Sequence, residues 1–439
     1  MKILKWNTKT ARDYVNSLSG KAGMGSAVEK AVLSIIKDVR VNGDKAVLKY
    51  TKRFDCPGMS VSAMKLKPAE AIKAYQNVDR PYLNAVDRLI KNIEDFEKKS
   101  LRRSWMKESG GVITGKYVRP LDSVGIYVPG GRASYPSSLI MCSVAARLAG
   151  VKRIVVVSPA DRKGGIDANV IVAANKLSIT EIYKVGGAQA VAALAYGTKT
   201  IPKVDKIVGP GSAYVAAAKR LLLGEVDIDM IAGPTEIAVL ADKGASASSI
   251  AADMLSQAEH DTDAACICVT PSLSLAKEIL KETDIQKTGL KRKKIIDAVL
   301  KNASIIITGN IEEATDVVNI IAAEHLQIMT KNPFGILAKI KNAGTIFLGE
   351  YSPVAIGDYA AGPSHVLPTA GTARFFSPLS VADFFKESNI ISCDKRGFKR
   401  LAPVAMKFAE IEKFDAHLNS LKIRENKDKG AKKSRNRCA

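Results

Sequence analysis

The feature that most constrains this fold is a regular alternation of strand-like and helix-like segments that begins near Val124. Short runs rich in Val and Ile, such as "VGIYV" and "RIVVV", are each followed by a longer run with helical periodicity, such as "SSLIMCSVAARLAG". Four such pairs follow one another, ending with "SAYVAAAKRLLLG". This alternation predicts a doubly wound parallel sheet with helices on both faces.

A second set of strand-like segments follows at "EIAVLAD", "ACICVT", "SIIIT" and "GTIFLG", with helices expected to start near Ser248, Ser274 and Ile311. Two α/β lobes with a cleft between them are therefore expected. Residues 10–100 instead show helical periodicity, with a break at Gly43. After Pro378, "LSVADFFKES" and a final helix around "APVAMKFAEIEKFDAHLN" are expected to form an appendage.

The composition indicates a folded protein without a membrane-spanning segment. The chain has 439 residues, 46% of them hydrophobic, which is enough for two or more packed domains. It has no uncharged apolar run of about 18 residues, and its start, "MKILKWNTKTARDY", turns polar too soon for a signal peptide. The six cysteines form no CxxC pair, which favours a reducing compartment. We therefore expect a cytoplasmic protein with no membrane partner.

The net charge of +22 raises the alternative of nucleic-acid binding. Residues 422–439 hold eight basic and two acidic residues, so this tail contributes +6 of the total and is expected to be disordered. The remaining +16 is spread along the chain without the interleaved aromatic residues that a base-stacking surface needs. Nucleic-acid binding is therefore the less favoured interpretation.

Three glycine-containing turns each lie between an expected strand and an expected helix of the alternating segment that begins near Val124. They are "YVPGG" (127–131), "VGGAQA" (185–190) and "VGPGSA" (208–213). All three are expected at the carboxyl edge of one sheet, where backbone N–H groups at helix starts can bind phosphate. A nucleotide site and simple tight turns are both consistent with this pattern.

The stretch "LSQAEHDTDAA" places Gln257 and His260 on one edge of an expected helix. At 100° per residue, the two side chains and that of Asp253 lie within about 60° of one another. By itself, such a pair fits a solvated helix face as well as a binding site.

The chain has only four histidines, and each lies beside a carboxylate or an amide. His325 follows Glu324, His365 shares a glycine-rich loop with Asp358, and His417 lies in "EIEKFDAHLN". These residue types suit zinc binding and acid–base chemistry. Because adjacent helical residues diverge by about 100°, Glu324 and His325 can hardly both bind one zinc ion, but both can address one substrate.

Several long motifs together resemble the histidinol dehydrogenase family. They include "VGIYVPGG", "NKLSITEIYKVGGAQAVAALAYGT", "KVDKIVGPGSAYVAAAKR", "IDMIAGPTEIAVLAD", "LSQAEHDTDA", "AAEHLQI" and "GDYAAGPSHVLPTAGTARFFSPLSV". The resemblance runs from about residue 25 to about residue 420. It implies a zinc-dependent oxidoreductase that oxidises L-histidinol to L-histidine through L-histidinaldehyde, reducing two NAD+ in the last steps of histidine biosynthesis. It also implies a homodimer whose C-terminal appendage crosses to the partner.

The resemblance also implies a role for each matching residue. His325 would be the general base, and Glu324 would activate the water that attacks the aldehyde. The single zinc ion of each subunit would be bound by Gln257, His260, Asp358 and, from the other chain, His417. The substrate would contact these four residues, His325 and three others, namely Thr235, His365 and Glu412. NAD would contact Tyr127, Gln189 and Ser212.

Two positions depart from the usual family pattern. Ser212 stands where asparagine is frequent, and losing one amide hydrogen bond to NAD is worth about 1 kcal/mol. Thr235 stands where serine is common, and it keeps the hydroxyl group.

The expected organisation follows from these observations. It comprises an N-terminal segment, a helical part of lobe 1, an NAD-binding lobe 2, the metal-binding and catalytic part of lobe 1, a C-terminal appendage exchanged between subunits, and a basic disordered tail (1–22, 23–123, 124–235, 236–378, 379–421 and 422–439). The alternative function is a related dehydrogenase for another small primary alcohol, such as a sulfonated diol. Glu412 and His417 suit a cationic amine and an imidazole, which argues against that alternative.

Overall fold

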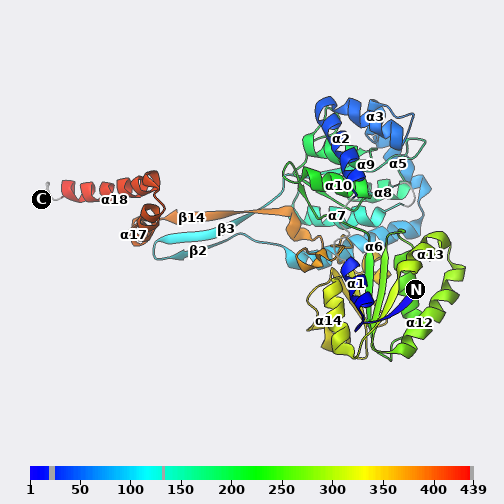
Figure 1. Cartoon of the computed structure of the whole chain (residues 1–439). Coiled ribbons are helices and arrows are strands. Elements are labelled where there is room, and N and C mark those ends of the chain that lie inside the picture. Colours follow the sequence, from blue (N-terminus) through cyan, green and yellow to red (C-terminus); the bar gives the residue numbers. More distant parts are fainter. Residues whose placement is uncertain (19–24, 131–133, 436–439) are drawn as a thin grey trace. The chain divides into compact units, whose positions relative to one another are not determined.

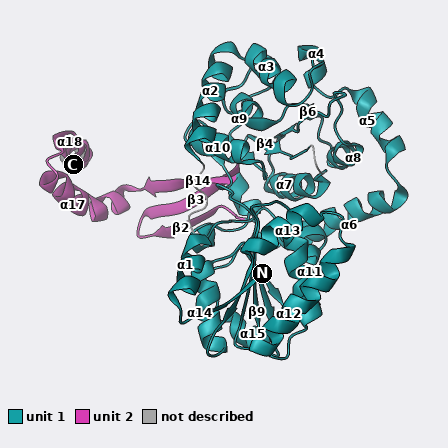
Figure 2. Cartoon of the chain, turned by 45° about the vertical axis from the view of Figure 1, so that its right-hand side comes forward, with its two compact units in different colours: residues 1–101, 121–384 teal, residues 102–120, 385–439 magenta. Residues whose placement is uncertain are grey.

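The structure, a computed structural model, describes residues 1–18, 25–130 and 134–435. Two compact units make up the chain, one of residues 1–101 and 121–384 and the other of residues 102–120 and 385–439 (Figure 2). The first unit contains two parallel sheets, here called sheet A and sheet B, and the second contains a small antiparallel sheet, sheet C. No helix in the described part of the chain is long and apolar enough to cross a membrane. The predicted α/β fold with Rossmann-like lobes is confirmed.

Sheet B holds five parallel strands in the order β6-β5-β4-β7-β8. Their bounds are β4 (Ser123–Tyr127), β5 (Arg153–Val157), β6 (Glu181–Tyr183), β7 (Lys206–Val208) and β8 (Asp227–Ile228). The chain runs outward from β4 to β6 and then returns to place β7 on the other side of β4. The strand order therefore reverses between β4 and β7, where doubly wound sheets open a crevice at their carboxyl edge.

Helices cover sheet B on both faces (Figure 1). Those that follow its strands are α7 (Pro136–Ala149), α8 (Ala168–Lys176), α9 (Gly187–Tyr196) and α10 (Ala213–Leu222). Helix α9 is buried along nearly its whole length, and its small alanine side chains allow other helices to pack closely around it.

The N-terminal helices pack on the sheet B lobe. They are α2 (Ser26–Asn42), α3 (Asp44–Phe54), α4 (Val61–Met64), α5 (Pro68–Ala74) and α6 (Arg80–Glu97). Val32 and Val39 of α2 share a core with Leu194 of α9 and Val215 of α10. This packing differs from the expected grouping of residues 23–123 with residues 236–378, because the apolar face of α2 fits the alanine-rich surface of α9.

Sheet A holds six parallel strands in the order β1-β11-β10-β9-β12-β13. Their bounds are β1 (Lys2–Lys5), β9 (Glu236–Ala241), β10 (Ala265–Thr270), β11 (Ser304–Ile307), β12 (His325–Met329) and β13 (Thr345–Leu348). Two of these strands were not anticipated. Strand β1 comes from the N-terminal segment and pairs with β11. Strand β12 lies between β9 and β13, and its pattern is interrupted by Gln327, whose amide donates to Asp253 at 2.6 Å.

The two faces of sheet A are covered by different helices. The covering helices are α1 (Lys9–Leu18), α11 (Ala247–Ala258), α12 (Leu273–Gln286), α13 (Lys293–Asn302) and α14 (Ile311–Ile321), with the shorter α15 (Pro333–Leu337) and α16 (Val354–Tyr359) later in the chain. Val239 of β9 packs with α11, α12 and α13, whereas its neighbours Ala238 and Leu240 pack with α1 and α14. Successive side chains of a strand point to opposite faces, so β9 needs apolar residues throughout.

The second unit consists of sheet C and two helices (Figure 2). Sheet C has the order β14-β3-β2, with bounds β2 (Trp105–Ser109), β3 (Val112–Pro120) and β14 (Phe385–Cys393). The helices are α17 (Lys395–Ile411) and α18 (Asp415–Arg435). The single final helix that we expected is broken, with Lys413 at a φ of +60°. Helix α18 extends into the basic tail, where no regular structure was expected but Lys, Arg and Ala are good helix formers; residues 436–439 lie outside the described range.

Candidate active site

Acidic and imidazole side chains gather at the amino edge of sheet A. Glu236 is the first residue of β9, and Glu324 directly precedes His325, the first residue of β12. Strands β9 and β12 are neighbours, and their register places His325 opposite Ile237. All three titratable residues are buried. The parallel pairing therefore brings the two glutamates and the histidine together.

A chain of short hydrogen bonds connects α11 to this edge. The side-chain amide of Gln257 donates to the hydroxyl of Thr235, which in turn donates to Oε2 of Glu324. The backbone N–H of Glu236 donates to the same carboxylate oxygen at 2.9 Å. The Oε1 atom of Gln257 is buried and has no hydrogen-bond partner among the described residues. This amide oxygen is thus available to a ligand.

The imidazole of His325 lies between backbone and carboxylate oxygens. Its Nδ1 is 3.2 Å from the carbonyl oxygen of Glu236 and 3.6 Å from Oε2 of Glu324. Its Nε2 is 3.5 Å from Oδ1 of Asp358 and makes no hydrogen bond to any described residue. Because a carbonyl oxygen only accepts, Nδ1 carries a hydrogen, and in the neutral ring Nε2 is the free base.

The pKa values at this edge reflect burial and close charges. Burial acts to lower the pKa of His325, but the Glu324 and Asp358 carboxylates outweigh it and raise this pKa to about 9. Burial raises the pKa of Glu324. Burial, together with the charge of Glu324, raises the pKa of Glu236 to about 8. Two adjacent buried carboxylates therefore favour one shared proton near neutral pH.

His365 joins the two lobes of the first unit. Its Nδ1 is 2.8 Å from the carbonyl oxygen of Asp358, and its Nε2 is 2.9 Å from the hydroxyl of Ser138. Ser138 lies in the first turn of α7, which follows β4 of sheet B. The amino edge of sheet A thus meets the carboxyl edge of sheet B at this contact.

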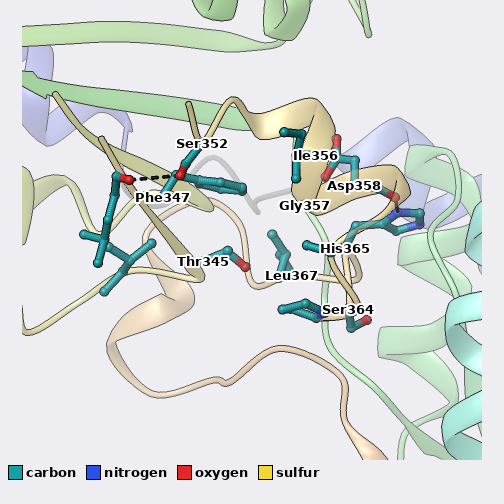
Figure 3. Close-up of a pocket in the computed structure, with 13 residues that line it drawn as sticks. Thr345, Phe347, Ser352, Ile356, Gly357, Asp358, Ser364, His365 and Leu367 are labelled. Carbon is teal, nitrogen blue, oxygen red and sulfur yellow. Dashed lines mark hydrogen bonds between the residues drawn. The ribbon is translucent and has the colours of Figure 1, made fainter. Parts of the chain in front are cut away.

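A cavity of about 290 Å³ opens beside these residues (Figure 3). Asp358 of α16 and His365 of the following loop line it, together with the apolar side chains of Phe347 and Leu367. The ring of Phe347 also lies 6.0 Å from that of His325, measured between centroids. The cavity therefore offers an apolar wall next to a carboxylate and an imidazole.

His260 lies just beyond the end of α11 and is exposed. The protein around the ring lowers its pKa, and the Asp358 carboxylate opposes this effect electrostatically. His260 and Asp358 are therefore close enough to interact electrostatically.

The three glycine-containing turns of sheet B also come together. The hydroxyl of Tyr127, at the end of β4, accepts the backbone N–H of Gly187 at 3.1 Å. Gly209 has a φ of +108°, and a Cβ atom there would lie 2.3 Å from the carbonyl oxygen of Tyr127. Gln189 is buried with its Nε2 unpaired among the described residues, whereas Ser212 is exposed at the start of α10. Gly131, in the first of these turns, lies outside the described residues.

The remaining two predicted residues belong to the second unit. Glu412 is exposed at the end of α17, and His417 is exposed in the first turn of α18. The ring of His417 lies 5.3 Å from that of Phe414, between centroids.

The donor atoms of the first unit fit part of a zinc site. Among the described residues, no group of three or more His, Cys, Asp or Glu side chains is arranged to hold a metal ion. Gln257 contributes an unpaired buried amide oxygen, and the imidazole of His260 interacts electrostatically with the carboxylate of Asp358. Imidazole nitrogen and carboxylate oxygen are usual zinc donors, and an amide oxygen is a less usual one. Structural zinc sites usually have four such donors in a tetrahedral arrangement.

Sequence reasoning missed three features of this region. Glu236 was read only as the start of an apolar strand, although an acidic residue at that position is itself a signal. The Asp253–Gln327 pair links α11 to β12, but nothing local to either residue indicates it. Ser138 is an ordinary serine in an apolar helix until the fold brings it to His365.

A family model, two relatives and a solved structure all point to one family. The family model described as histidinol dehydrogenase matches residues 20–425. The histidinol dehydrogenase of Caldanaerobacter subterraneus subsp. tengcongensis is 53% identical over 90% of this chain and 92% of its own. That of Halalkalibacterium halodurans is 50% identical over 90% of this chain and 93% of its own. The crystal structure of histidinol dehydrogenase from Elizabethkingia anophelis superposes with a TM-score of 0.92 at 34% identity, covering 97% of this chain and 98% of that one.

Proposed function

This chain belongs to the histidinol dehydrogenase family, and on that premise we propose that the amino edge of sheet A is its catalytic centre. The function is that of an NAD-dependent oxidoreductase of histidine biosynthesis, which oxidises L-histidinol to L-histidine through L-histidinaldehyde. The family generally uses NAD and zinc. The alternative of another small primary alcohol as substrate is not favoured, because the family model and both relatives cover most of the chain.

His325 is the general base of the first oxidation. Its Nδ1 is held by the Glu236 carbonyl oxygen, which leaves Nε2 to accept the hydroxyl proton as hydride leaves for NAD+. The nearby carboxylates favour the protonated ring, since they raise the pKa of His325 to about 9. Proton acceptance therefore requires that the charge of Asp358 be offset.

Glu324 activates the water of the second oxidation. Thr235 and the Glu236 N–H both hold Oε2, so the carboxyl group is fixed in orientation. Burial raises the pKa of Glu324, which makes its carboxylate a stronger base than an exposed one. The water adds to the aldehyde carbon, and a second hydride then leaves for NAD+.

Gln257, His260 and Asp358 would hold zinc together with His417 of the partner subunit. When bound, zinc would orient the imidazole and amine of histidinol and offset the Asp358 charge beside His325. Thr235, His365 and Glu412 would contact the substrate. Tyr127, Gln189 and Ser212 would contact NAD, since the turns that carry them converge at the carboxyl edge of sheet B.

A homodimer is supported by the apolar surface of the second unit. Trp105, which is 53% exposed, and Met106 lie on β2, and Ile391 lies on β14. Helix α17 adds a row of exposed apolar side chains at helical spacing, formed by Leu401, Val404, Phe408 and Ile411. Apolar patches of this kind mark interaction surfaces, and a second copy of the chain is the partner that would also supply His417. Sedimentation velocity should give a dimer, and a monomer at micromolar concentration would contradict this part of the proposal.

A cytoplasmic location also belongs to the proposal. Five cysteines in the described part of the chain are free thiols, as expected in a reducing compartment.

The observation that carries the function is the buried arrangement of Glu324 and His325, with His325 Nε2 unpaired and facing Asp358. The deciding experiment counts NADH formed per L-histidinol consumed, with a sulfonated diol as the competing substrate. Two NADH per histidinol and no rate with the diol are expected. A rate with the diol alone would favour the alternative function, and one NADH per histidinol would remove the role given to Glu324.

A further inference from the structure

We propose that Glu236 is a positioning residue that fixes the Glu324 carboxyl group for the second oxidation. The proposal rests on the function proposed above and adds a residue to the aldehyde-oxidising step.

Two hydrogen bonds connect Glu236 and Glu324. Oε1 of Glu236 accepts the backbone N–H of Glu324 at 3.3 Å, and the backbone N–H of Glu236 donates to Oε2 of Glu324 at 2.9 Å. Strands β9 and β12 are direct neighbours, so these two hydrogen bonds connect the first residues of two adjacent strands. The Glu236 side chain therefore fixes the backbone from which the Glu324 carboxylate extends.

The Glu236 carboxyl group also accepts a hydrogen bond from a strained turn. Oε1 of Glu236 accepts the N–H of Gly371 at 3.4 Å. The preceding residue, Ala370, has a φ of +54°, in the left-handed region that costs a non-glycine residue about 1 kcal/mol or more. The turn ends the loop that carries His365, and Gly233 donates to Thr369 at its start. Glu236 thus connects the loop beside the cavity to the strands that carry the catalytic pair.

Burial indicates that Glu236 acts as an uncharged acceptor. Its side chain is 4% exposed, and burial and the Glu324 charge raise its pKa to about 8. A neutral Glu236 leaves the negative charge on Glu324, the group that needs it. Glutamine, which keeps an Oε1 acceptor without a charge, should therefore replace Glu236 well, whereas an apolar residue should not.

The two half-reactions should respond differently. His325 is held by the backbone carbonyl oxygen of Glu236, which any residue at this position retains. Loss of the side chain should therefore disturb Glu324 more than His325. This selectivity separates positioning from a general loss of stability, which would slow both steps alike.

The test compares Glu236→Gln and Glu236→Met in the full-length, zinc-loaded protein. L-histidinol and L-histidinaldehyde are supplied separately, and NADH is followed in single turnovers. Glu236→Met should slow aldehyde oxidation by about tenfold or more while alcohol oxidation changes by less than about threefold. Glu236→Gln should stay within about threefold of the wild type in both steps. NADH per histidinol should fall below two only in the Met variant.

Glu97 provides a matched control. Its side chain is 1% exposed and accepts the N–H of Val381 at 2.7 Å, outside the site. Glu97→Met should lower the melting temperature without changing the ratio of the two half-reactions. If Glu236→Met does not fold, Glu236→Asp, which shortens the side chain by one methylene, should show the same selective loss.

Two outcomes would overturn the inference. One is equal slowing of both half-reactions, and the other is a Gln variant as impaired as the Met variant. Failure of the wild type to oxidise histidinol would instead remove the proposed function, so the two failures are distinguishable.

Discussion

The site uses the amino edge of sheet A and the carboxyl edge of sheet B. Sheet B presents its carboxyl edge, where glycine turns expose backbone N–H groups, and sheet A presents its amino edge, where Glu236, Glu324 and His325 begin or precede strands. The contact between Ser138 and His365 joins the two edges. The rule that ligands bind at carboxyl ends of parallel strands thus describes one half of this site and would have missed the other.

The two edges also differ in electrostatic character. Helices α9 and α10 begin at the carboxyl edge of sheet B, and helix starts carry partial positive charge that favours phosphate. Helix α11 ends at the amino edge of sheet A with Gln257 in its last turn, and helix ends favour cations. One edge therefore suits the pyrophosphate of NAD, and the other suits a metal ion and a cationic substrate. Substitutions on each edge should affect different steps.

His325→Asn should give the largest effect, because it removes the proposed general base from the amino edge of sheet A. We expect kcat to fall by about 10²- to 10⁴-fold. Zinc content and the KM for NAD should stay near wild type, because this substitution removes neither a proposed zinc ligand nor a proposed NAD contact. Steady-state kinetics and metal analysis provide the check. Near-normal turnover would show that this edge does not carry the chemistry.

His260→Asn should act on the same edge through the metal. We expect zinc affinity to fall by about 100-fold or more, because a proposed zinc ligand is lost. Zinc per chain, measured after dialysis against a weak chelator, should drop towards zero. Asp261→Asn, one position further along, is the control and should retain zinc. Full zinc occupancy in His260→Asn would remove this residue from the ligand set.

Gly209→Ala tests the carboxyl edge of sheet B. The new Cβ would lie 2.3 Å from the Tyr127 carbonyl oxygen at a φ of +108°, a clash and strain of about 1–3 kcal/mol. We expect a lower melting temperature and a KM for NAD raised by about tenfold. Gly224→Ala is the control, since its φ is +103° but no atom lies within 4 Å. Equal changes in both variants would mean that strain alone, and not contact with Tyr127, is responsible.

Much of the fold follows from local sequence, but the site does not. Alternating strands and helices are local patterns, and they predict both lobes. Strand β12 was not predicted, because buried Gln327 interrupts its apolar run. Asp253, the hydrogen-bond partner of Gln327, is distant in the chain. The packing of α2 on α9 depends on surfaces that local periodicity does not pair.

Within the site, helix geometry predicted Gln257 and His260 on one edge of a helix, but α11 ends at Ala258 and His260 lies beyond it. The structure separates them by environment, with Gln257 buried and His260 exposed. Grouping them with Asp358 and His417 came only from the family resemblance, because such long-range grouping leaves no periodic signal. The role of Glu236 was not predicted, because strand patterns describe the apolar faces of a strand and not its polar first residue.

A pH measurement sharpens the description of the amino edge. Burial and the Glu324 charge raise the pKa of folded Glu236 to about 8 from its usual value of 4.5. The folded chain therefore binds a proton that the unfolded chain releases between these pH values, so the unfolding free energy falls as pH rises through this window. Glu236→Gln should remove this contribution. Urea unfolding of both proteins across the window is the measurement, and a pH-independent difference would contradict the assignment.

Ser212→Asn should give the smallest effect, confined to the carboxyl edge of sheet B. An added amide hydrogen bond to NAD is worth about 1 kcal/mol, or about a fivefold lower KM for NAD. The value of kcat should not change. Ser212→Ala is the companion variant, and identical KM values for all three proteins would show that this position does not touch the cofactor.

The chain's two tryptophans divide between its two units. Trp6 packs partly buried against the core of sheet A, whereas Trp105 stands exposed on β2. Coverage of that surface by a second subunit would move one indole out of water and leave the other unchanged. Intrinsic fluorescence should therefore shift to shorter wavelength on association, which gives the unlabelled protein an optical signal for its own assembly during dilution.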